Sequence, residues 1–119
     1  MASNSEIEEL GVKAVIDWEK AKGRDKHERV NKCGYDLKTF NNSEERHIEI
    51  KSTSKNRFTW RWLEQMEYDQ FQNDEKFWLY LVTDVEGTPK VIPYSREKLK
   101  ARFDEEIRHY VFVFPKSDF

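Results

Sequence analysis

Residues 46–52 alternate between polar and apolar side chains, which is the pattern of a β-strand with two different faces. Because successive side chains of a strand point to opposite sides, Ile48 and Ile50 are expected to enter a core. Glu49 and Lys51 then lie side by side on the other face. The strand is therefore predicted to contribute to the core and to present two charged groups at the same time.

A β-hairpin is predicted just before this strand. Residues 41–43, Asn-Asn-Ser, are typical of a turn, and a short strand that begins near Asp36 precedes them. Twelve residues lie between Asp36 and Glu49, enough for the chain to turn and return antiparallel. The two carboxylates are therefore expected to meet on neighbouring strands.

The rest of the chain alternates between helical and strand patterns. Apolar residues recur at helical spacing from Ser5, the expected N-cap, to about Lys22, with Gly23 as the stop. A second helix is predicted from Thr59 through Phe71, followed by an apolar run at residues 77–83 that is typical of a central strand covered on both faces. A short strand at 91–92, a short helix after residue 95 and a final strand at 110–114 complete an α/β pattern.

Length and composition indicate one domain that spans residues 1–119. No apolar run is long enough to cross a membrane, and the first residues lack a signal pattern, so a cytoplasmic protein without membrane contact is expected. Cys33 is the only cysteine, which excludes disulfides and cysteine-based zinc sites within one chain. Four glycines at positions 11, 23, 34 and 87 cannot form a phosphate-binding loop or a dinucleotide fingerprint.

The net charge of −2 is not typical of a strong nucleic-acid binder, which usually has a basic surplus. Setting aside three acids that are candidates for a metal site, Glu19, Asp36 and Glu49, leaves the rest of the chain at +1. The overall balance therefore does not exclude a nucleic-acid substrate.

The predicted pair of carboxylates, Asp36 and Glu49, suits a divalent cation. Two carboxylates about 4 Å apart repel by roughly 4 kcal/mol at an effective dielectric constant near 20, so a proton or cation is expected between them. Ligation by carboxylate oxygens alone favours Mg²⁺ or Mn²⁺ over zinc. Lys51 could then orient a water molecule or meet the charge on a phosphoryl group. Alternatively, Glu49 and Lys51 belong to a solvated salt-bridge ladder, which many half-buried strands show.

The order and spacing of several segments resemble the PD-(D/E)XK nuclease superfamily. Within it the chain is most similar to the family named after the C-terminal domain of the plant protein NO VEIN, a domain of unknown function related to Mrr-type restriction nucleases. The resemblance implies a restriction-endonuclease-like mixed sheet of four to six strands flanked by helices. It also implies a metal-dependent endonuclease that hydrolyses phosphodiester bonds in DNA, in restriction and defence or in repair. The segments that carry it are Trp18-Glu19-Lys20 with Gly23-Arg24, Gly34-Tyr35-Asp36-Leu37, Ile48-Glu49-Ile50-Lys51, residues 58–64 and residues 77–82.

The resemblance implies a role for each site residue. Asp36 and Glu49 hold Mg²⁺ or Mn²⁺, the main-chain carbonyl of Ile50 adds a ligand, and Lys51 positions the attacking water. An acid from the first helix assists, and Glu19 is preferred because it falls in a matching segment. Glu9, on the same line of the helix, stays open as an alternative, as does a surface ion pair between Glu19 and Arg24 or Lys20.

The segment after the predicted strand contains basic and hydroxyl side chains but no acid. It follows directly on Lys51, so its charge is expected where a nucleic-acid backbone would run. Lys, Arg, Ser and Thr are the usual phosphate contacts, although a generic polar loop has a similar composition. The candidate substrate-binding residues are Thr53, Ser54, Lys55, Arg57 and Arg61.

A second function stays open, because the second helix departs from a pattern of the superfamily. In several nuclease branches that helix carries a Gln and a Tyr four residues apart. Here Glu64 and Tyr68 hold that spacing. The missing glutamine and the acidic balance favour a catalytically inactive nuclease-fold module that binds nucleic acid or protein within a larger complex. The expected partners are DNA, defence or repair proteins, and a second copy of the chain, because cutting both strands of a duplex needs two sites.

Overall fold

The computed structural model describes residues 2–30, 34–58, 62–103 and 112–113, and the structural statements below concern these residues. The main sheet has five strands in the order β1-β2-β3-β5-β6. Strands β1, β2 and β3 pair antiparallel, β3 and β5 pair parallel, and β5 and β6 pair antiparallel. This mixed sheet confirms the predicted fold class. Its strands are Lys26–Arg29 (β1), Leu37–Phe40 (β2), Glu45–Ser52 (β3), Phe77–Thr83 (β5) and Lys90–Ser95 (β6).

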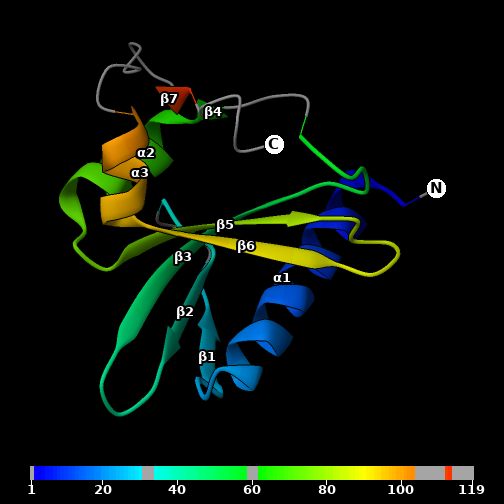
Figure 1. Ribbon diagram of the computed structural model, residues 1–119, viewed down its shortest axis with the longest axis horizontal. Helices are drawn as coiled ribbons and strands as arrows, with labels where there is room; N and C mark the ends of the chain where they lie inside the picture. The colour runs from blue at the N-terminus through cyan, green and yellow to red at the C-terminus, as the bar shows by residue number, and fades with distance from the viewer. Residues whose placement is uncertain (1, 31–33, 59–61, 104–111, 114–119) are drawn as a thin grey trace.

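Helices cover both faces of the sheet (Figure 1). Helix α1, Asn4–Ala21, packs on one face, while α2, Gln65–Asn73, and α3, Arg96–Phe103, lie on the other. The parallel pairing of β3 with β5 requires a crossover, and α2 lies within it. A separate pair of two-residue strands, β4 (Trp62–Leu63) and β7 (Phe112–Val113), lies next to α2 and α3 in Figure 1.

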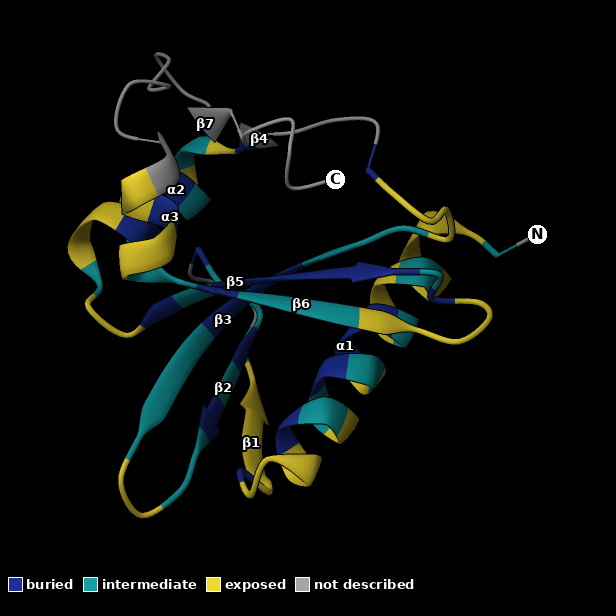
Figure 2. Cartoon of the chain, viewed as in Figure 1, coloured by how far each residue is buried: buried dark blue, intermediate teal, exposed yellow. Residues whose placement is uncertain are grey.

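Strand β5 separates two hydrophobic cores and is the most deeply buried strand in Figure 2. Its odd-numbered residues Phe77, Leu79 and Leu81 pack with α2 and α3, whereas Tyr80 and Val82 pack with α1. Ile48 and Ile50 of β3 belong to the α1 core, as their alternation predicts. Glu49 and Lys51 consequently lie on the α2 side of the sheet.

Two predicted helix starts are wrong. Helix α1 is capped by Ser3 rather than Ser5, because the Ser3 hydroxyl accepts from the Glu6 amide and the Glu6 carboxylate accepts from the Ser3 amide. Both pairs have the capping-box spacing, and the earlier one forms. Helix α2 begins at Gln65, since residues 62–63 pair as β4; Thr59, the predicted cap, lies outside the described residues. Gly23 has φ = 87° just after α1, in agreement with its predicted role as the stop.

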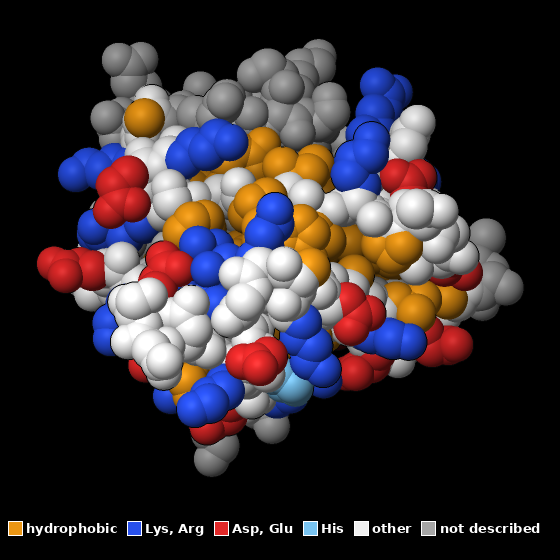
Figure 3. Space-filling view, turned by 60° about the horizontal axis from the view of Figure 1, so that its bottom comes forward, with side chains coloured by type: hydrophobic (Ala, Val, Ile, Leu, Met, Phe, Trp, Pro, Cys, Tyr) orange, Lys and Arg blue, Asp and Glu red, His pale blue; other side chains and the backbone are white. Residues whose placement is uncertain are grey.

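The surface view in Figure 3 shows hydrophobic side chains surrounded by Lys, Arg, Asp and Glu side chains of both signs. Partly buried apolar residues of α1, including Ile7, Leu10 and Trp18, pack at the edge of their core and remain partly exposed. None of the helices in the described part of the chain combines the length and hydropathy that a membrane span needs.

Candidate functional site

The β2–β3 hairpin places Asp36 beside the centre of β3. Leu37 pairs with Ile48 in the antiparallel register, and the Asp36 amide donates to the Ile48 carbonyl at 2.8 Å. The Ile50 amide donates to Asp36 Oδ2 at 2.9 Å, so the carboxylate is held against the backbone next to Glu49. The predicted hairpin is therefore present, and Asp36 and Glu49 lie together on it.

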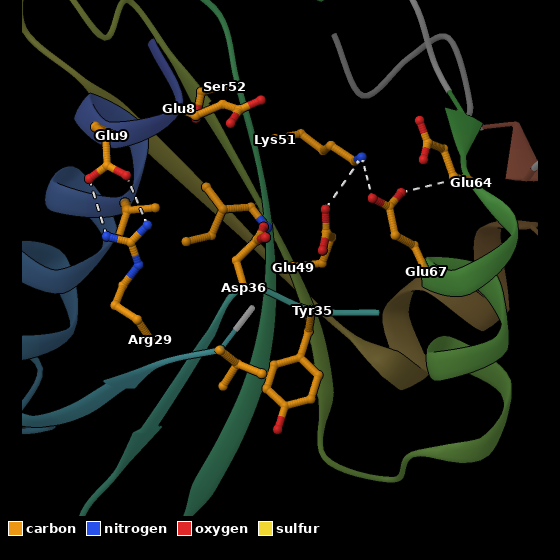
Figure 4. A pocket seen from close by; sticks show the side chains of 13 residues that line it. Glu8, Glu9, Arg29, Tyr35, Asp36, Glu49, Lys51, Ser52, Glu64 and Glu67 are labelled. Carbon is orange, nitrogen blue, oxygen red and sulfur yellow. Dashed lines mark hydrogen bonds and ion pairs between the residues drawn. The ribbon is translucent and has the colours of Figure 1, made fainter. Parts of the chain in front are cut away.

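Asp36, Glu49 and Lys51 line one pocket of about 640 Å³ between β3, the start of α1 and α2 (Figure 4). Six acidic and two basic residues contribute to its wall, so the pocket is strongly acidic. The residues that line it are Glu8, Glu9, Val12, Arg29, Val30, Tyr35, Asp36, Glu49, Ile50, Lys51, Ser52, Glu64 and Glu67.

Glu49 is the most strongly perturbed acid of the pocket. Its side chain is buried, at 4% relative exposure for the residue. Burial raises the pKa of Glu49 well above its ordinary value, and the negative charges of Glu67 and Asp36 raise it further, while Lys51 opposes them. Glu49 therefore favours its protonated form more than an exposed glutamate does.

The pKa of Asp36 is also raised, chiefly by burial. The amide of Ile50, a hydrogen bond with the Glu49 carboxyl group and the charge of Lys51 lower it, but they do not compensate for the burial. The two adjacent acids thus both have raised pKa values, a pattern that functional sites share with structural charge clusters.

The Lys51 ammonium bridges two carboxylates. Its Nζ lies 2.7 Å from Glu67 Oε2 and 3.3 Å from Glu49 Oε2, with 14% of the Lys51 side chain exposed. Burial lowers the pKa of Lys51, but the charges of Glu49 and Glu67 outweigh that effect and raise it. Lys51 is therefore held as a cation at the edge of the acid pair.

The oxygen donors of the pocket fit a hard divalent cation that keeps part of its water shell. Within the described residues, no three His, Cys, Asp or Glu side chains are arranged to hold a metal by themselves. Asp36 and Glu49 supply two carboxylates, and Ile50, whose amide donates to Asp36, also lines the pocket. Mg²⁺ commonly binds through one or two carboxylates and completes its coordination with water or substrate phosphates.

The structure does not bring Glu19 to this pocket. Glu19 lies on the α1 side of the sheet, 1% exposed, where Arg24 donates to both of its oxygens at 2.8 and 3.0 Å. Thr39 and Tyr80 also donate to it, at 2.6 and 2.8 Å. The pairing with Arg24 that the sequence left open is present, but it is buried rather than on the surface.

Glu9, the alternative helix acid, does line the pocket. It forms a bidentate ion pair with Arg29 of β1, at 3.1 and 2.9 Å, on the opposite side of Asp36 from Lys51 (Figure 4). The helical line that Glu9 shares with Glu19 therefore begins at the pocket and ends in the buried cluster between α1 and the sheet. If one acid of α1 assists the pair, the geometry favours Glu9.

The candidate substrate-binding residues lie in the loop that follows β3, beside the pocket rather than within it. Ser54, Lys55 and Arg57 are exposed and Thr53 is partly buried, and none of these four lines the pocket. Arg61 lies outside the described residues. The loop adjoins Ser52, which is on the pocket wall.

Sequence reasoning missed Glu67, Arg29 and Tyr35, which all line the pocket. A signal for Glu67 was present, because it lies three residues after Glu64 and therefore on the same side of a helix. Tyr35 stacks on the ring of His47 with centroids 4.6 Å apart, and His47 contacts Asp74 and Glu45 through its two ring nitrogens. This cluster links β3 to the end of α2 next to the pocket.

A family model described as "Protein NO VEIN, C-terminal" matches residues 7–94. The match spans α1, the hairpin, β5 and most of β6, and therefore includes every described residue of the pocket. Searches among curated proteins and among solved structures found no match.

Proposed function

The chain belongs to the NO VEIN C-terminal family, and from that premise we propose that it is a metal-dependent endonuclease that hydrolyses phosphodiester bonds in DNA. The substrate class comes from the resemblance to PD-(D/E)XK nucleases. The single observation that carries the proposal is the meeting of Asp36, Glu49 and Lys51 in one acidic pocket. A role in restriction and defence or in repair belongs to the same proposal.

Each residue has a defined task in this proposal. Asp36 and Glu49 hold Mg²⁺ or Mn²⁺, with the Ile50 carbonyl as a further ligand. When bound, the cation supplies Lewis-acid stabilisation and lowers the pKa of water. Lys51, kept as a cation by two carboxylates, orients the water and offsets negative charge on the phosphoryl group. Thr53, Ser54, Lys55, Arg57 and Arg61 are the proposed contacts to the DNA backbone.

A second candidate is a catalytically inactive module that binds nucleic acid or protein within a larger complex. Four more acids than bases line the pocket. An anionic polymer approaches such a pocket only if cations neutralise it. Cation binding is therefore the property on which the two candidates differ.

Isothermal titration with Mn²⁺ distinguishes them. Wild-type protein is expected to bind Mn²⁺, and Asp36→Ala to lose that binding because it removes one of two carboxylate ligands. Asp69→Ala, an exposed acid on α2 outside the pocket, is the matched control and should bind as the wild type does. Absence of Mn²⁺ binding by wild-type protein contradicts the nuclease and favours the module.

Plasmid cleavage in the presence of Mn²⁺ tests the reaction itself. Glu49→Ala and Lys51→Ala should each abolish cleavage, whereas Asp69→Ala should retain it. Cleavage that persists in both Glu49→Ala and Lys51→Ala would reveal a contaminating nuclease and contradict the proposal. Sedimentation of the protein with and without a duplex tests the homodimer, which double-strand cutting requires.

A further inference from the structure

Helix α2 approaches the hairpin more closely than any residue with a Cβ would permit. A Cβ atom added at Gly34 would lie 2.1 Å from the main-chain carbonyl oxygen of Met66. That contact is with backbone, which cannot move aside as a flexible side chain can. Gly34 therefore lets the first turn of α2 lie directly against the segment that carries Asp36.

This close approach brings Glu67, one residue after Met66, to the pocket. Glu67 Oε2 lies 2.7 Å from Lys51 Nζ, and Glu67 Oε1 accepts from the amide of Glu64 at 2.9 Å. The Glu67 carboxylate is thus fixed at both oxygens, and 14% of its side chain is exposed. A carboxylate held in this way can hold its partner in place, because it loses little conformational freedom.

We infer that Glu67 is a positioning residue, which holds the Lys51 ammonium against Glu49 and adds negative charge to the cation-binding side of the pocket. The inference deepens the proposed nuclease function and rests on it. Without Glu67, the Lys51 ammonium loses the shorter of its two described ion pairs, 2.7 Å against 3.3 Å to Glu49, and is held less firmly. Glu67 therefore acts on the reaction through Lys51 and does not itself touch the substrate.

Glu67→Gln is the test, because glutamine keeps an oxygen that can accept from the Glu64 amide and so preserves the start of α2. Glu64→Gln is the matched comparison. Glu64 lies at the same end of α2 and also lines the pocket. The Glu64→Gln substitution therefore removes one negative charge from the pocket but keeps the contact between Glu67 and Lys51. Glu67→Asp retains the charge on a shorter side chain.

The first measurement is the rate at which N-hydroxysuccinimidyl acetate acetylates Lys51, followed by peptide mass spectrometry. An ammonium that is buried and ion-paired reacts slowly. Glu67→Gln is expected to raise the Lys51 rate several-fold, Glu67→Asp to fall between it and wild type, and Glu64→Gln to leave the rate unchanged. Equal Lys51 rates in wild type and Glu67→Gln, or in Glu64→Gln and Glu67→Gln, overturn the inference.

The second measurement is Mn²⁺ affinity by isothermal titration. Glu67→Gln is expected to weaken it by about tenfold or more, as the loss of an outer-shell partner of a metal site commonly does. Unchanged Mn²⁺ affinity overturns the part of the inference that concerns charge. If wild-type protein neither binds Mn²⁺ nor cleaves DNA, the proposed function fails, while the acetylation rates still decide whether Glu67 positions Lys51.

Discussion

Glu19 of α1 and Glu49 of β3 are both buried glutamates, but they lie on opposite faces of the sheet and their pKa values shift in opposite directions. Their relative exposures, 1% and 4%, are nearly equal. Burial opposes the ionisation of Glu19, yet hydrogen bonds from Arg24, Thr39 and Tyr80 outweigh it and lower the pKa. Around Glu49, burial is reinforced by the charges of Glu67 and Asp36, and the pKa rises.

The comparison shows that burial alone does not set the direction in which the pKa of an acid shifts. What distinguishes the two glutamates is whether their neighbours donate hydrogen bonds or carry the same charge. The Glu19 cluster is complete within the protein, and it stabilises the contact of α1 with the sheet. In the Glu49 cluster, Lys51 forms ion pairs with Glu49 and Glu67, and its charge also acts on Asp36.

The largest expected effect is the loss of stability when the ion pair between Arg24 and Glu19 is broken. Arg24→Ala removes both guanidinium bonds and leaves the buried Glu19 carboxylate with the longer ion pair to Arg46, at 3.9 Å. Removing one partner of a buried ion pair commonly costs about 3–5 kcal/mol of unfolding free energy. Urea denaturation followed by circular dichroism measures the loss. Arg29→Ala, which breaks the exposed ion pair with Glu9, is the control and should cost much less. Equal losses would contradict the assignment of Glu19 and Arg24 as a structural pair.

The second-largest expected effect is stabilisation of the protein by a cation that binds at Asp36 and Glu49. Mn²⁺ at tenfold its dissociation constant should add about 1.4 kcal/mol to the unfolding free energy. Thermal unfolding with and without Mn²⁺ measures the gain, and excess EDTA should remove it. Asp36→Asn should show no such gain, whereas Arg24→Ala, although less stable, should gain as much as wild type. A gain of the same size in Asp36→Asn would place the cation elsewhere.

Neutralising Glu49 should stabilise the protein in the absence of metal. Glu49→Gln keeps the shape of the side chain and removes a charge that is repelled by Glu67 and Asp36, so we expect a gain of about 1 kcal/mol at neutral pH, at the expense of function. Glu19→Gln, the same substitution on the other face, should destabilise. Chemical denaturation of both variants in EDTA makes the comparison, and a loss of stability in Glu49→Gln would contradict it.

The smallest expected effect is on the pH dependence of stability. Glu19 and Glu49 should contribute to the unfolding free energy with opposite pH dependences. The pKa of Glu19 is lowered from 4.5, so its contribution to stability is present above pH 4.5 and is lost as the pH falls through the lowered value. The pKa of Glu49 is raised from 4.5, so its contribution is present below pH 4.5 and is lost as the pH rises through the raised value.

Denaturation curves between pH 3 and 8 in EDTA test these signs. The stability difference between wild type and Glu19→Gln should shrink toward acid pH. The advantage of Glu49→Gln over wild type should grow as the pH rises above 4.5. If the contributions of both glutamates to stability changed with pH in the same direction, the two environments would not differ as described.

The sequence predicts the hairpin and the division of β3 into two faces because both follow from local rules. Alternation assigns Ile48 and Ile50 to the core, and the turn at residues 41–43 brings Asp36 back beside Glu49. The parallel pairing of β3 with β5, by contrast, depends on a crossover whose start was misplaced by several residues.

The remaining site residues depend on tertiary packing that no local pattern specifies. The position of Glu67 requires the contact between Gly34 and the backbone of α2, which joins segments more than thirty residues apart. Glu19 and Glu9 share a line on α1, but Glu9 reaches the pocket and Glu19 pairs with Arg24. Helix periodicity predicts that the two acids share a line, but it does not predict which end of that line lies at the pocket.

The two-faced alternation of β3 has a consequence for the lengths that related chains can have. An insertion or deletion of one residue between Glu45 and Lys51 would turn the isoleucines toward the pocket and the charged pair toward the α1 core. Additional residues in the turn at 41–44 would leave both faces as they are. We therefore expect length variation among relatives to concentrate in that turn and to be absent from the strand that follows it.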